Sequence, residues 1–182
     1  NEAARDQLAA VLKSAPDYLP AVLLAGSVEY SLGNMQTAES HLNKVVKASP
    51  RNLYALRLLA AIQLRLGRAD DAARTLAGIP DSVDDAGYHM VAGEVALAKK
   101  DFDKASIHFE RASKIAPESA AIRTELGVAR LAQGDERAMA DLQTAAAMDG
   151  SSSRADTVII LNQLRQDKFD AALVSIAAIE KK

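Results

Sequence analysis

The sequence predicts an all-α protein in which antiparallel helix pairs stack into a solenoid of about eleven helices. Three observations lead to this prediction: closely packing apolar residues, a pattern that returns about every 34 residues, and Pro or Gly where helices should end. With 182 residues, the chain is long enough to bury a core as one domain or as a repeat array.

The composition favours helices that approach one another closely. Apolar residues make up 49% of the chain, but aromatic residues only 4%, and there is no Trp. The core must therefore be packed with Ala, Leu, Val and Ile. Abundant Ala and Leu with few β-branched runs favour helix over strand.

The charges exclude several classes of partner. The 22 basic and 24 acidic residues are interspersed and give a net charge of -2. No Lys/Arg block could follow a phosphate backbone, so we expect no nucleic-acid partner. No apolar run approaches the roughly 18 to 20 residues of a membrane-spanning helix. Without cysteine, neither a disulfide nor a thiolate metal site can form.

Three ladders of residues repeat with steps of 33 or 34 residues. The first places a small residue in the middle of each first helix of a pair, at Gly26, Ala60, Gly93 and Gly127, before Ile160. The second places Ala early in each second helix, at Ala4, Ala38, Ala72, Ala105, Ala138 and Ala172. The third marks helix ends, at Pro16, Pro50, Asp84, Pro117 and Gly150.

This period and content resemble the tetratricopeptide repeat, a helix-turn-helix unit that stacks into a right-handed solenoid. The cleanest copy carries Ala92-Gly93, Ala105, Phe109, Ala112 and Pro117. The resemblance divides the chain into a half repeat and five repeats, at residues 1–18, 19–52, 53–85, 86–119, 120–152 and 153–182. Because the array begins with only the second half of a repeat, we expect the chain to be an internal segment of a longer protein.

Each recurring residue type has a physical role in such a unit. Gly or Ala in the first helix lets the second helix cross closely, and Leu42, Leu76, Phe109, Leu142 and Ile176 fill the space beyond the crossing. Gly33, Gly67 and Gly134 suit turns that need a positive φ. The second repeat is irregular, because Gly78-Ile79-Pro80 should break its second helix early.

Four stretches resemble a narrower family, the tetratricopeptide-repeat lipoprotein of the bacterial PEP-CTERM system. They are residues 19–30, 58–67, 123–135 and 177–182. The resemblance implies a periplasmic scaffold, anchored to the outer membrane by a lipid in the full-length protein. It also implies a connection with exopolysaccharide production and the sorting of PEP-CTERM proteins. A cytoplasmic location is the alternative.

No catalytic or metal-binding constellation is expected, and no cofactor. His41, His89 and His108 lie on separate helices without the spacing of a metal motif. The acidic residues Asp81, Asp84 and Asp85 do not match a calcium loop. Asp84 or Asp85 is better placed to cap the helix that follows.

The resemblance implies that partners bind in a concave groove lined by the first helices. We predict ligand-binding residues there at Tyr30, Tyr54, Arg57, Arg65, Met90 and Glu94. Tyr and Arg are frequent at binding hot spots. The two tyrosines could instead fill gaps between helices. A repeat that clamps the C-terminal tail of a chaperone requires Asn at a pair of groove positions. The residues at these positions include no Asn in any repeat of this chain: Leu23/Ser27, Arg57/Ala61, Met90/Glu94, Thr124/Val128 and Thr157/Leu161.

These residues predict a non-catalytic scaffold that binds a protein or peptide. A polysaccharide-binding module, in which tyrosines stack on sugar rings, and a generic cytosolic adaptor are the alternatives. The oligomeric state and the identity of the partner do not follow from the sequence.

Overall fold

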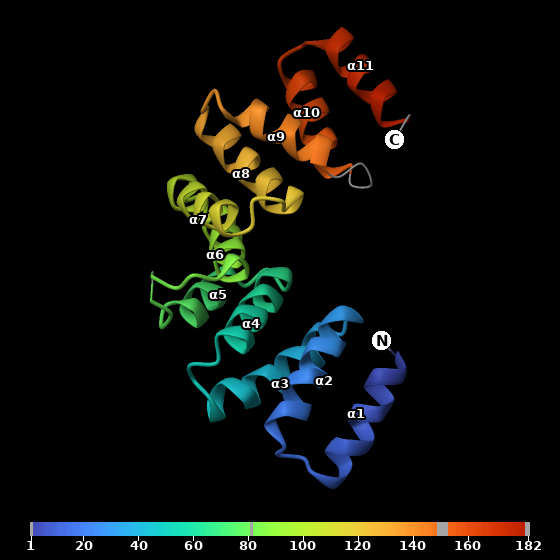
Figure 1. Ribbon diagram of the computed structural model, residues 1–182, viewed down its shortest axis with the longest axis vertical. Helices are drawn as coiled ribbons and strands as arrows, with labels where there is room; N and C mark the ends of the chain where they lie inside the picture. Colours follow the sequence, from blue (N-terminus) through green and yellow to red (C-terminus); the bar gives the residue numbers. More distant parts are fainter. Residues whose placement is uncertain (1, 81, 149–152, 181–182) are drawn as a thin grey trace. The chain divides into compact units, whose positions relative to one another are not determined.

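A computed structural model describes residues 2–80, 82–148 and 153–180 of the chain (Figure 1). Across these residues it contains eleven α-helices and no β-strand. The prediction of an all-α fold of about eleven helices is confirmed.

The chain divides into two compact units, Asn1–Val83 and Asp84–Lys182. The first unit holds α1 (Glu2–Ser14), α2 (Leu19–Ser31), α3 (Met35–Ala48), α4 (Leu53–Arg65) and α5 (Ala69–Leu76). The second holds α6 (Ala86–Ala98), α7 (Phe102–Ile115), α8 (Ala120–Gln133), α9 (Ala138–Met148), α10 (Arg154–Arg165) and α11 (Phe169–Ile179).

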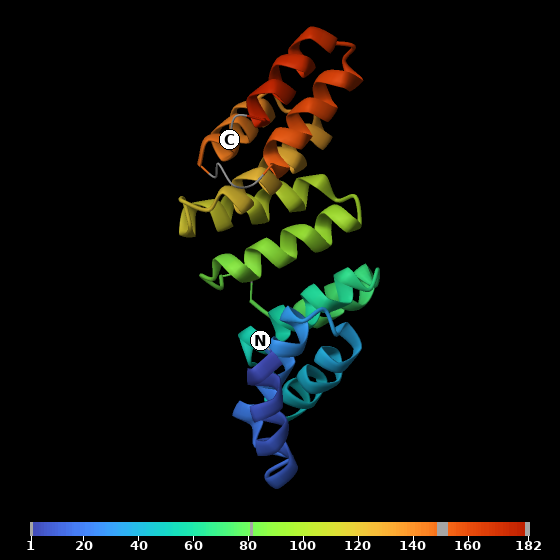
Figure 2. The same cartoon turned by 90° about the vertical axis from the view of Figure 1, so that its right-hand side faces the viewer.

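Within each unit, every helix packs against the next one along the chain. Figure 2 shows α6 and α7, drawn in lime green, side by side as an antiparallel pair. The first helices of successive pairs also touch: α2 contacts α4, α6 contacts α8, and α8 contacts α10. Each unit therefore presents neighbouring first helices, on which a shared surface can form.

Side-chain caps and left-handed turns set the helix ends. Asn52 accepts a hydrogen bond from the Ala55 N–H, and Asp85 accepts one from the Tyr88 N–H, which confirms the predicted cap of α6. Gly33, Gly67 and Gly134 have φ values of 82°, 75° and 74°, as predicted. Where the glycine is missing from this turn, Lys100 and Asp167 adopt the same left-handed conformation, with φ of 60° and 57°. The turn geometry is thus kept even without the residue that favours it.

The close crossing of paired helices is visible at the small residues of the first helices. A Cβ added at Gly93 would lie 2.5 Å from the Phe109 ring, and one added at Gly127 would lie 2.7 Å from the Leu142 side chain. At Gly26 the nearest atom, on Leu42, is 3.0 Å away. The predicted role of these glycines is confirmed.

Alanine and a few large side chains make up the core. The alanines that recur early in the second helices α3, α5, α7, α9 and α11 are almost fully buried. Leu42, Phe109 and Leu142 have no exposed surface. Burying a side chain of this size contributes about 2 kcal/mol or more. Small residues allow the approach, and large residues fill the space beside it.

The second pair of the first unit is shortened, as the sequence predicts. Helix α5 ends at Leu76 after eight residues, whereas α7 has 14. The segment Gly78-Ile79-Pro80 follows outside any helix. The predicted helix end at Gly150 falls outside the described residues.

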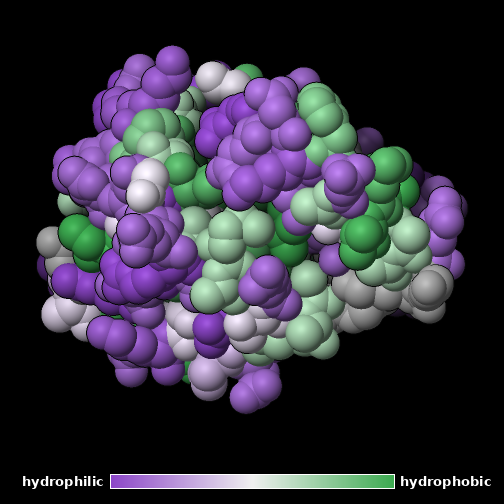
Figure 3. Space-filling model, turned by 90° about the horizontal axis from the view of Figure 1, so that it is seen from above, coloured by the Kyte–Doolittle hydropathy of each residue, from purple (hydrophilic) through white to green (hydrophobic). Residues whose placement is uncertain are grey.

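The last helix presents apolar side chains to the surface. Leu173 and Val174 are 64% and 72% exposed, and Phe169 is 58% exposed. Figure 3 looks onto this end of the second unit and shows green hydrophobic atoms among purple hydrophilic ones. None of the described helices is both long and apolar enough to cross a membrane.

The substitution Gly93→Ala should lower the free energy of unfolding of the second unit by about 1–2 kcal/mol. The overlap with Phe109 outweighs the gain in helix propensity. Gly26→Ala is the matched control and should be close to neutral, because its contacts are longer. Urea denaturation followed by circular dichroism, with amide exchange in α6 and α7, measures both. A Gly93→Ala chain as stable as the native one would contradict the close-crossing account.

Candidate functional site

Helices α2 and α4 bring four of the six predicted binding residues onto one face of the first unit. Tyr30 lies at the end of α2, and Tyr54, Arg57 and Arg65 lie along α4. We call these four residues the tyrosine–arginine surface. They come together because α2 and α4 are the first helices of successive pairs and touch each other.

Ser27 ties the two helices together beside this surface. Its hydroxyl donates to the Leu23 carbonyl oxygen at 3.0 Å. Since that hydroxyl has one hydrogen, its oxygen is left to accept from the Tyr54 hydroxyl, 3.2 Å away. The bond holds the Tyr54 side chain in place across the two helices.

Each tyrosine of the surface carries an arginine over its ring. The Arg65 guanidinium carbon is 5.4 Å from the centroid of the Tyr30 ring, and Arg65 Nε donates to the Tyr30 hydroxyl at 3.1 Å. The Arg57 guanidinium carbon is 5.2 Å from the centroid of the Tyr54 ring. Cation–π contacts of this kind contribute about 0.5–1 kcal/mol at exposed sites. They also limit the rotamers of both arginines before any partner binds.

The two tyrosines differ in how much of the ring remains available. Tyr54 is 45% exposed, whereas Tyr30 is partly buried and packs against the core cluster around Val22 and Leu42. The gap-filling alternative therefore describes part of the role of Tyr30. Tyr54 presents its ring to solvent.

The chemistry of the tyrosine–arginine surface suits a partner with carboxylates and an apolar or aromatic group. Two guanidinium groups provide planar donors that match carboxylate geometry. The Tyr54 ring provides an apolar contact at little entropic cost, because it is already hydrogen-bonded. Aromatic rings and guanidinium groups of this kind are typical of recognition surfaces.

The remaining predicted residues, Met90 and Glu94, lie on α6 of the second unit. Met90 packs against the core cluster of Phe109 and Leu126, and Glu94 is half-buried. They belong to a different unit from the tyrosine–arginine surface, and a ligand-binding role for them stays a prediction.

Sequence reasoning missed a charged cluster inside the second unit. Arg130 of α8 is 9% exposed, donates to Asp141 of α9, and donates to Glu110 of α7 at 2.6 Å. Although burial disfavours the charged form, the bonds with Glu110 and Asp141 hold the pKa of Arg130 above its ordinary value. The signal in the sequence is a polar residue at one register of four of the five first helices, Glu29, Gln63, Arg130 and Gln163, where α6 has Ala96.

A pair of histidines was likewise unforeseen. His89 of α6 and His108 of α7 lie with their Nδ1 atoms 3.1 Å apart, and the Tyr88 ring packs edge-on against both. His89 is 2% exposed. Nowhere in the described part of the chain do three or more His, Cys, Asp or Glu side chains gather in a way that could hold a metal ion. The pair is a buried polar contact that joins α6 to α7.

Comparison with protein families identifies the repeat. Three models, each described as a tetratricopeptide repeat, match residues 1–52, 29–94 and 86–119. The chain is built of tetratricopeptide repeats. Proteins with this repeat are generally scaffolds for protein–protein interaction. No curated protein matches the chain.

Solved tetratricopeptide-repeat structures share the fold. A thermophilic repeat protein of Thermus thermophilus superposes with a TM-score of 0.73, at 23% identity over 90% of each chain. MamA of Desulfovibrio magneticus RS-1 gives 0.68, at 19% identity over 81% of this chain and 84% of its own. The APC/C hetero-tetramer Cut9–Hcn1 gives 0.80, at 18% identity over 95% of this chain and 35% of that one. Identities this low show a common fold alone.

Replacing Arg130 with Ala should destabilise the second unit by about 3 kcal/mol, because Asp141 would remain buried without its main partner. The paired replacement Arg130→Met with Asp141→Leu should cost clearly less, since it removes both members of the buried pair. Urea denaturation compares the variants. A smaller loss for Arg130→Ala than for the double replacement would contradict this account.

Proposed function

We propose that the protein is a non-catalytic scaffold that binds a protein or peptide at the tyrosine–arginine surface. The observation that carries the proposal is the tyrosine–arginine surface itself, where Tyr54, Arg57 and Arg65 of α4 lie beside Tyr30 of the neighbouring first helix α2. Arg57 and Arg65 are held over tyrosine rings, so little side-chain entropy is lost when a partner arrives. Preorganised Tyr and Arg side chains are the residues most often found at binding hot spots.

The fold supports this role without identifying the partner. Stacked repeats present an extended surface that follows the first helices of each unit. The solved complex of Cut9 with Hcn1 is one case in which a chain of similar fold is part of a multi-protein assembly. A protein or peptide partner for this chain follows from the same kind of surface.

A polysaccharide ligand is the alternative, and the exposed Tyr54 ring is the observation that favours it. A sugar ring would have to stack on a face of Tyr54, and the Arg57 guanidinium already covers one of the two faces. A peptide carboxylate can use Arg57 without displacing it. The geometry therefore favours the peptide.

We further propose that this scaffold works in exopolysaccharide-associated protein sorting or envelope assembly. The support is the resemblance of residues 19–30, 58–67, 123–135 and 177–182 to the PEP-CTERM repeat lipoproteins. The same resemblance supports a periplasmic location with a lipid anchor in the full-length protein. The coding sequence upstream should then contain a signal peptide and a lipid-bearing cysteine; a cytoplasmic start at this position would contradict the placement.

The double replacement Tyr54→Ala/Arg57→Ala should weaken binding of peptides selected from a random display library by at least about tenfold. Loss of the aromatic contact and of one guanidinium removes two hot-spot residues together. Isothermal titration calorimetry of the selected peptides measures the change.

Tyr18→Ala is the matched control, because Tyr18 is 56% exposed in the same unit but lies outside the surface. It should leave affinity unchanged. Selected peptides that bind the double variant as tightly as the native chain would refute the assignment. Exopolysaccharide fragments that bind through Tyr54, while no library peptide does, would establish the alternative ligand.

A further inference from the structure

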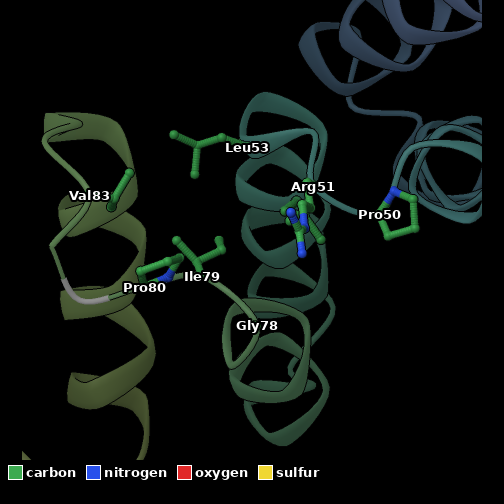
Figure 4. Close-up of a pocket in the computed structure, with 8 residues that line it drawn as sticks. Pro50, Arg51, Leu53, Gly78, Ile79, Pro80 and Val83 are labelled. Atoms are coloured by element: carbon green, nitrogen blue, oxygen red, sulfur yellow. The ribbon is translucent and has the colours of Figure 1, made fainter.

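A pocket of about 430 Å³ opens on the first unit, and no residue of the tyrosine–arginine surface lines it. The turn before α4, the start of α4 and the segment after α5 form its walls (Figure 4). Its lining residues are Pro50, Arg51, Leu53, Leu56, Gly78, Ile79, Pro80 and Val83. Figure 4 shows Arg51 and Pro50 toward one side, and Ile79, Pro80 and Val83 toward the other.

The pocket exists because α5 is short. In α3, α7 and α9 the second helix continues for one or two more turns and buries a side chain at this level, namely Val45, Ala112 and Ala145. The residue in the corresponding place here is Ile79, which lies beyond the end of α5. A hollow therefore remains beside the first turn of α4. In pairs with a longer second helix, that helix occupies this place.

Most of the residues that line the pocket are apolar, and backbone hydrogen bonds join residues of its walls. The Ile79 N–H donates to the Leu76 carbonyl oxygen at 3.0 Å, and the Val83 N–H donates to the Pro80 carbonyl oxygen at 3.1 Å. Proline at positions 50 and 80 restricts the backbone further. A Cβ added at Gly78 would meet no atom within 4 Å, so the wall borders open space there. The hollow is formed before a ligand arrives.

Arg51 is the single charged residue of the lining. It is exposed, and no side chain in the described part of the first unit accepts a hydrogen bond from its guanidinium or forms an ion pair with it. Arg68 of the same unit, in contrast, pairs with Glu39 at 2.6 Å. An unpaired guanidinium beside an apolar hollow is complementary to a carboxylate that carries an apolar group.

We propose that this pocket binds the free C-terminal residue of a partner peptide that ends in a large apolar side chain. The terminal carboxylate pairs with Arg51, and the side chain enters the hollow between Leu53, Leu56 and Ile79. A C-terminal residue carries both groups on one Cα, which matches a small pocket with one cation at its edge. Burial of one Leu or Phe side chain supplies about 1.5–3 kcal/mol, and the charged pair fixes its orientation.

The site goes beyond the tyrosine–arginine surface and uses none of its residues. The two sites can therefore fail separately: Tyr54→Ala/Arg57→Ala tests one, and substitutions at Arg51 and Gly78 test the other. A partner that reaches both would bind more tightly than through either alone.

The experiment measures binding of the full chain to an array of peptides with free C-termini that differ in the last residue. We expect Leu, Ile or Phe at the last position to be preferred, and amidation of the terminus to weaken binding by about tenfold or more. Arg51→Gln should cause a similar loss. Gly78→Leu should also weaken binding, because it adds bulk at the open wall without backbone strain.

Arg5→Gln removes the same charge from α1 and is the matched control; it should leave binding unchanged. Equal binding of free and amidated peptides, or native affinity in Arg51→Gln, would overturn the proposal. So would an absence of binding at millimolar peptide. Decanoate binding that depends on Arg51, with no peptide bound, would overturn the peptide in favour of a fatty acid.

Discussion

The close contact between a small residue in the middle of a first helix and a large side chain of its partner helix is the constraint on which the rest of the structure depends. At Gly93 and Gly127, the rings and branches of Phe109 and Leu142 occupy the space that a Cβ would need. This contact sets the distance between paired helices at that level. It leaves the opposite face of the first helix to meet the next first helix, as α2 meets α4. The tyrosine–arginine surface is a consequence of that second contact.

The same repeat shows what happens when one of its parts is shortened. Where a full second helix is present, its last turns bury Val45 or Ala112 against the start of the first helix. Where α5 stops at Leu76, Leu53 and Ile79 line a hollow instead. A departure from the repeat thus creates a local feature that the regular units lack. Irregular positions in a solenoid are for this reason good places to look for specific recognition.

Periodicity made the fold and part of the site predictable. The steps of 33 or 34 residues placed the close crossings and the left-handed turns, because each depends on one residue type at one register. The early end of α5 followed from Gly78-Ile79-Pro80, which interrupts the repeat. The contact between Tyr30 and Arg65 was also predictable, because the repeat places both residues at groove positions on first helices. The Arg130 cluster and the contact of His89 with His108 did not, because they depend on which polar side chains face each other across helices. The pocket beside Arg51 depends on how the chain turns after α5, which no period describes.

The most direct test of the binding surface is the response of the four tyrosine rings to a peptide chosen from a random display library. The chain has tyrosine at positions 18, 30, 54 and 88, and only two of these lie on the tyrosine–arginine surface. With ring-labelled tyrosine, NMR should show that the peptide shifts the signals of Tyr30 and Tyr54 and leaves those of Tyr18 and Tyr88 in place. Shifts confined to Tyr18 or Tyr88, with Tyr30 and Tyr54 unmoved by saturating peptide, would contradict the account.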